Sequence, residues 1–79
     1  MALLISVTPA GEGWAVHSDA LDQPLSFSGG ARAEQAARAL ASRYADAGQS
    51  AEVRVFLKDG ALAGRFLHPT RGAPTLLAG

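Results

Sequence analysis

The chain has 79 residues, so we expect one small domain rather than two. Seven basic and seven acidic residues give zero net charge, which argues against a protein that binds nucleic acid or membranes with its whole surface. The absence of cysteine excludes disulfides and cysteine-based metal sites and suits the reducing cytoplasm. Two histidines are too few for a zinc site made of histidine alone, although carboxylates could join them. We expect no metal and no cofactor.

Three segments in the first third of the chain have the character of β-strands. Residues 2–8 alternate Leu, Ile and Val with other residues, as a strand with one buried face does. Residues 9–13 contain one proline and two glycines, and we expect a five-residue loop there before a second strand over 14–17. Residues 24–28 are expected to form a short third strand, because their leading proline suits a strand start or a sheet edge.

Residues 31–47 have the pattern of an amphipathic helix. Small and apolar residues recur at i, i+3 and i+4 and are expected to form its buried stripe: Ala33, Ala36, Ala37, Leu40, Ala41 and Tyr44. Because most of these are alanine, the helix is expected to lie close to a sheet. We expect Ser28 or Gly30 to cap its N-terminal end and Gly48 to follow its C-terminal end.

Residues 52–68 have the pattern of a β-hairpin around Asp59-Gly60, which is a preferred two-residue type I′ loop because both of its positions need positive φ. Such a loop places Lys58 opposite Ala61. The alternation of side chains then directs one set of pairs toward the core: Leu57 with Leu62, Val55 with Gly64, and Val53 with Phe66. The other set points outward: Phe56 with Ala63, Arg54 with Arg65, and Glu52 with Leu67.

The expected order of elements is therefore β-β-(β)-α-β-β. This order predicts the α+β class, with an antiparallel sheet of four to five strands and one helix packed on one face. The domain is expected to span residues 1–68. Residues 69–79 contain two prolines and two glycines and are expected to form an irregular C-terminal tail. No apolar run approaches the ~20 residues of a membrane span, so we expect no membrane partner.

Three motifs mark the strands and the helix: Gly13-Trp14-Ala15-Val16, Ala36-Ala37-Arg38-Ala39-Leu40-Ala41 and Asp59-Gly60. Together they resemble small bacterial domains of unknown function, which open with a Trp-x-Val strand, follow with an Ala-rich helix and close with an Asp-Gly hairpin. The resemblance covers about residues 2–68. The chain departs from it in residues 18–30, which are longer and richer in glycine. The resemblance implies the fold and supplies no activity.

The outward face of the last hairpin carries the candidate binding residues Arg54, Phe56, Lys58 and Arg65. Basic side chains that flank an aromatic ring on an open sheet are typical of single-strand nucleic-acid or anion binding. Like charges directly opposite each other are unfavourable, so a second interpretation is a solvated surface on which Glu52 or an acid from the first third neutralises the arginines. A third interpretation is a dimer interface that covers Phe56.

No catalytic residues can be assigned. His17-Ser18-Asp19 contains the residue types of a catalytic triad, but neighbouring positions cannot adopt its spatial arrangement, so a surface turn is expected. His17 and His68 could bind a metal ion if the two side chains met across the sheet. No nucleophile, base and orienting group recur at a recognisable spacing, and we therefore predict that the protein is not an enzyme.

We predict a non-enzymatic interaction module that binds a second copy of itself, as a homodimer, or another protein. A short chain with an alanine-lined helix has little apolar area to stabilise it alone. Residues 1–30 carry three acids and no base, and residues 31–79 carry seven bases and four acids, so the two parts have net charges of −3 and +3 that suit association. The alternative prediction is nucleic-acid or other anion binding through Arg54, Phe56, Lys58 and Arg65.

Overall fold

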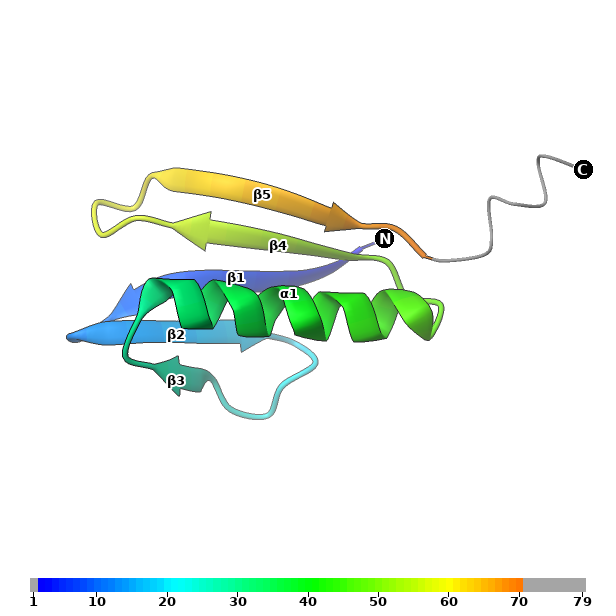
Figure 1. The fold of residues 1–79 in the computed structure, drawn as a ribbon, viewed down its shortest axis with the longest axis horizontal. Coiled ribbons are helices and arrows are strands. Elements are labelled where there is room, and N and C mark those ends of the chain that lie inside the picture. Colours follow the sequence, from blue (N-terminus) through cyan, green and yellow to red (C-terminus); the bar gives the residue numbers. More distant parts are fainter. Residues whose placement is uncertain (1, 71–79) are drawn as a thin grey trace, which may run out of the picture.

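The computed structural model describes residues 2–70 and places one helix across one face of a five-stranded sheet (Figure 1). The strands lie in the order β3-β2-β1-β4-β5. Along the chain the elements are β1 (Leu3–Ala10), β2 (Gly13–Ser18), β3 (Leu25–Phe27), α1 (Gly30–Asp46), β4 (Ala51–Phe56) and β5 (Leu62–His68). The predicted α+β class is confirmed. Of the expected tail, all but Pro69 and Thr70 lies outside the described residues.

The sheet is mixed, because β1 and β4 run parallel while the other three strand pairs are antiparallel. The prediction of a purely antiparallel sheet is wrong in this respect. Each connection from β1 through β2, β3 and α1 to β4 reverses the direction of the chain, so β4 runs the same way as β1. Parallel neighbours need a long crossover connection, and here β2, β3 and α1 together form it.

The core lies between the central strands and α1. Its largest fully buried side chains are branched residues of three adjacent strands: Ile5, Val7, Val16 and Val53. On α1 the buried residues are Ala33, Ala37, Ala41 and Ala45, a stripe with a spacing of four. Ala45 was not expected there, and the predicted Ala36, Leu40 and Tyr44 are only partly buried. The alanine stripe lets the helix approach the sheet closely, so that the strands provide most of the buried volume.

Phe66, which was expected in the core, packs against it only in part. The guanidinium group of Arg38 lies over the Phe66 ring, 4.4 Å from its centroid, at a distance typical of a cation–π contact. A long helix side chain therefore covers the part of β5 that the narrow alanine stripe does not reach.

The first hairpin is tighter than expected, because Ala10 pairs with Gly13 and the loop consists of Gly11 and Glu12 alone. The expected five-residue connection is therefore wrong, and both strands extend into the Pro- and Gly-containing segment. After this hairpin, the Trp14 ring packs on the start of α1, where a Cβ atom on Gly30 would lie 2.9 Å from it. Gly30 is thus a close-approach position and not a cap.

The helix ends are set by glycines. The N-cap residue is Gly29, with no side-chain hydrogen bond, so neither Ser28 nor Gly30 has the predicted capping role. At the other end, Gly48 has positive φ and follows the C-cap, as predicted. The amide N–H groups of Gly48 and Gln49 donate to the carbonyls of Ala45 and Tyr44, which is the Schellman pattern.

The second hairpin has the predicted register only in the half that is farther from its loop. Glu52, Val53, Arg54 and Val55 pair as expected, but Phe56 lies opposite Leu62 because the register shifts by one residue between Val55 and Phe56. Ala63 is the extra residue in this bulge. Leu57 and Leu62, which were expected in the core, are 48% and 49% exposed. Leu62 shares the face of Phe56, away from α1, and Leu57 follows the last residue of β4.

The loop explains the shift. Leu57 and Ala61 are joined by a hydrogen bond, which leaves a three-residue loop in place of the expected two-residue loop. The Gly60 amide also donates to the Leu57 carbonyl. Of the three loop residues only Gly60 has positive φ, at 90°. A type I turn followed by one left-handed residue is the common three-residue hairpin loop. The predicted type I′ turn is therefore wrong, because Asp59 does not adopt positive φ.

Replacing Gly60 by valine is expected to lower the free energy of unfolding by about 1–3 kcal/mol, the cost of forcing a β-branched residue into positive φ. The space around Gly60 is open, so a steric clash adds nothing. Gly60→Asn is the matched control, since asparagine tolerates this conformation. Urea titrations of both variants measure the difference, and equal stabilities would contradict this account of the loop.

Candidate binding face

The face of the sheet opposite α1, the open face, carries side chains that alternate with the core residues along each strand. The strand register aligns these side chains in rows across the sheet. One row crosses β1, β4 and β5 with Leu4, Glu52 and Leu67. The next row begins on β2 and contains His17, Ser6, Arg54 and Arg65. The two predicted arginines therefore lie side by side, as expected.

Glu52 is the centre of this face, and only 9% of its surface is exposed. Its Oε2 atom accepts hydrogen bonds from Nε of Arg54 at 2.5 Å and from Nε of Arg65 at 2.9 Å. Nη2 of Arg65 also donates to Oε1, at 3.4 Å. The three side chains form the Glu52 cluster, in which one carboxylate bridges two guanidinium groups.

The Glu52 cluster removes the repulsion that opposed arginines would otherwise have. Hydrogen bonds from Arg54 and then from Arg65 hold the pKa of the Glu52 carboxyl below its usual 4.5, although partial burial acts in the other direction. Glu52 therefore stays ionised in the folded protein at neutral pH. The cluster retains one net positive charge, and the side chains of Arg54 and Arg65 are 41% and 54% exposed.

Glu52→Gln is expected to lower the melting temperature at neutral pH, because the neutral amide no longer balances two guanidinium groups. A depressed pKa in the folded state stabilises the protein above the unfolded-state pKa, and this stabilisation is lost as the pH falls through the lower folded-state value. The difference between wild type and Glu52→Gln should therefore shrink as the pH falls below about 4.5.

Thermal melts over a descending pH series measure this effect. Glu34→Gln is the control, since Glu34 forms an exposed pair with Arg38 on the helix surface, and such pairs contribute little. A difference between wild type and Glu52→Gln that is the same at every pH would contradict a role for the Glu52 charge.

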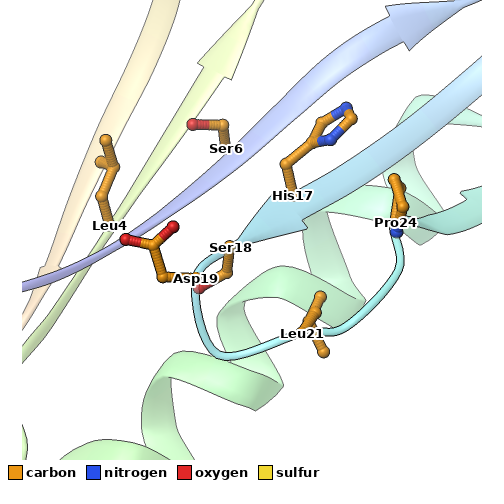
Figure 2. Close-up of a pocket in the computed structure, with 7 residues that line it drawn as sticks. All are labelled: Leu4, Ser6, His17, Ser18, Asp19, Leu21 and Pro24. Carbon is orange, nitrogen blue, oxygen red and sulfur yellow. The ribbon is translucent and has the colours of Figure 1, made fainter.

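A shallow hollow of about 320 Å³ lies beside the cluster, at the β2 end of the open face. In Figure 2, Leu4 and Ser6 project from β1 and His17 projects from β2, on the side of the sheet away from α1. Asp19 lies at the rim, in the turn after β2. The hollow thus brings a hydroxyl, an imidazole and a carboxylate near each other, although within residues 2–70 no hydrogen bond joins Ser6, His17 and Asp19.

The other two predicted binding residues lie elsewhere. Phe56 and Lys58 line a separate hollow at the tip of the second hairpin, together with Thr8 and Pro9. The four predicted residues therefore divide into an arginine pair and an aromatic–lysine pair. His68 stands opposite Ala51, a core residue, so it is on the helix side of the sheet and cannot meet His17.

Sequence reasoning missed Ser6 and His17 as members of this face. The signal was the length of the first loop, because a two-residue loop at Gly11-Glu12 places Ser6 opposite His17. Recognition of Gly11-Glu12 as the complete turn would have paired Ser6 with His17, while their alignment with the arginines also depends on the parallel pairing of β1 with β4. The five-residue loop that we expected hid this pairing.

In the part of the chain that the structure describes, no helix is both long and apolar enough to cross a membrane. The comparisons with known proteins find no matching family model, no matching curated protein and no matching solved structure. The resemblance to small bacterial domains of unknown function therefore stays a prediction. A function has to be inferred from the chemistry of the open face.

Proposed function

We propose that this protein is a small, non-enzymatic interaction module of the cytoplasm that acts as a homodimer and presents its open face to protein partners. The observation that supports this most directly is the row of Leu4, Glu52 and Leu67. Leu4 is 42% exposed and Leu67 is 65% exposed, and between them lies a carboxylate already paired with two arginines. Apolar residues beside arginines are typical of protein interfaces.

The balance of charge favours protein partners over nucleic acid. Because Glu52 offsets one of the two guanidinium groups, the arginine pair carries less positive charge than the hairpin sequence suggested. Phe56, the ring on which a base would stack, lines a different hollow from the one beside the Glu52 cluster. Nucleic-acid binding through Arg54, Phe56, Lys58 and Arg65 nevertheless remains testable, since phosphate contacts produce a steep dependence of affinity on salt.

The absence of catalysis is part of the proposal. A triad requires a nucleophile and a base in hydrogen-bond contact, with a third group that orients the base. Ser6, His17 and Asp19 are the only such residue types that we find gathered on the described open face, and they have no hydrogen bonds to one another. A simpler role for these three side chains is to keep the surface around the hollow hydrated.

Sedimentation velocity over a concentration series tests the proposal. The chain mass is 8.1 kDa, and we expect a species of twice that mass at micromolar concentrations. Leu67→Glu should weaken association by roughly tenfold or more, since it introduces a charge at an apolar contact. Leu25→Glu is the matched control, because Leu25 is 40% exposed but lies on the helix side of β3.

A monomer at high micromolar concentration would contradict the proposal of a homodimer. Tight binding of a single-stranded oligonucleotide that weakens steeply with salt would replace the proposal with the nucleic-acid function. Weak binding with a shallow salt dependence would support the proposal.

A further inference from the structure

The two edges of the sheet differ in a way that bears on how a second copy would bind. The β3 edge has only three residues and follows Pro24 closely. The β5 edge has seven residues, Leu62–His68, and contains neither proline nor lysine. Within residues 2–70, the outward backbone groups of β5 have no hydrogen-bond partner. An edge strand of this length is a template for pairing with another strand.

The usual protection of such an edge is weak here. Charged side chains on an edge strand oppose pairing, and Arg65 is the one Lys, Arg, Asp or Glu in β5. Its guanidinium group is turned toward β4, where it donates to Glu52. Leu67, in the same strand, is the most exposed large apolar residue within residues 2–70. The edge therefore presents an unpaired backbone beside an apolar side chain, with its charge directed inward.

We infer that a second copy of this chain pairs antiparallel with β5, so that two five-stranded sheets become one continuous sheet with both helices on the same side. This inference rests on the proposed homodimer and specifies its interface. A two-fold axis perpendicular to the sheet places one residue of β5 opposite its own copy, and near the strand centre this residue is Gly64, Arg65 or Phe66.

Charge and apolar burial select among these three registers. With Arg65 at the axis, two like charges would lie directly opposite each other, which is unfavourable. With Gly64 at the axis, Leu67 would face Ala61 of the second copy, beyond the end of its β5 strand. With Phe66 at the axis, Leu67 lies opposite Arg65 of the second copy. The aliphatic stem of that arginine can then cover Leu67 while its head remains with Glu52.

Disulfide trapping tests this register, because the chain has no cysteine of its own. Residues directly opposite each other in antiparallel strands have Cα atoms about 4.5–5.5 Å apart, within the range that a disulfide spans. A mixture of the Leu67→Cys and Arg65→Cys variants should form a mixed disulfide under mild oxidation. The control mixture, Leu67→Cys with Ala63→Cys, reports the register centred on Arg65 and should give little mixed disulfide.

Hydrogen exchange of the wild-type protein provides a readout without substitutions. The outward amides of β5, which do not bond to β4, should gain protection as the concentration rises through the dimerisation range, while the outward amides of β3 should not. Leu4 lies two strands from the β5 edge. Leu4→Glu should therefore leave the dimer intact, whereas Leu67→Glu should dissociate it.

The outcomes separate the inference from the proposed function. A wild-type monomer overturns both. The edge pairing is overturned if a dimer forms without the Leu67–Arg65 crosslink and without concentration-dependent protection of β5. It is also overturned if Leu4→Glu dissociates the dimer. In both cases the proposed homodimer itself is retained. Protection of the outward amides of β5, those not bonded to β4, in the dilute monomer would mean that this edge is already covered within one copy, which also overturns the inference.

Discussion

Replacing Ile5 by alanine is expected to lower the free energy of unfolding by about 2–5 kcal/mol, the range for deletion of a buried branched side chain. Ile5 is completely buried in β1, where it stands between Ser18 of β2 and Val53 of β4. The alanines that face it from α1 are too small to fill the resulting cavity. Small domains have a narrow margin of stability, so this single change should leave much of the protein unfolded at 37 °C.

Two controls make the Ile5 result specific. Ile5→Val removes one methyl group and should cost only about 0.5–1.5 kcal/mol. Leu4→Ala changes the neighbouring residue, which lies on the open face and is 42% exposed, and should cost less than about 1 kcal/mol. Urea denaturation followed by circular dichroism gives all three values. If Leu4→Ala were as damaging as Ile5→Ala, the assignment of the two sheet faces would be incorrect.

Replacing Ala37 by leucine is expected to destabilise the protein by about 1–3 kcal/mol, because the added carbons have no space between α1 and the sheet. Ala37 is completely buried near the middle of the alanine stripe. Alanine and leucine are both strong helix formers, so a loss of helix propensity cannot account for an effect of this size. The expected cause is separation of the helix from the strands.

Ala39→Leu provides the matched control, since Ala39 is exposed on the same helix two residues further along. It should change the free energy of unfolding by no more than about 0.5 kcal/mol. Thermal and urea denaturation of both variants measure the contrast. A neutral or stabilising Ala37→Leu would mean that the helix lies farther from the sheet than its alanine stripe allows.

A homodimer formed through the open faces and one formed through the β5 edges would differ in whether Leu4 lies at the interface. Both leucines lie in the row with Glu52 on the open face, but only Leu67 lies on the edge strand. Contact between two open faces would involve both residues, and pairing of two β5 edges would involve Leu67 alone. Comparison of the two glutamate variants therefore distinguishes the modes of association without any knowledge of a further partner.

Local patterns in the sequence determined the elements and part of the candidate site. Alternation identified β1 and β2, the spacing of alanines identified α1, and Gly48 marked the end of the helix. The pairing of Arg54 with Arg65 was also predicted correctly, although from a loop one residue too short. The bulge at Ala63 compensates for that residue, which is why the register is right near Arg54 and wrong near Phe56.

Only the tertiary structure decided how the elements are arranged. The position of β4 beside β1, which makes β1 the central strand, depends on a competition between sheet edges: β1 offers eight residues for pairing and β3 offers three. The exposure of Leu62 depends on the bulge at Ala63, which places Leu62 opposite Phe56 on the open face. The bridging of two arginines by Glu52 depends on side-chain directions across β4 and β5. Each of these results from contacts between residues distant in sequence, which local spacing does not encode.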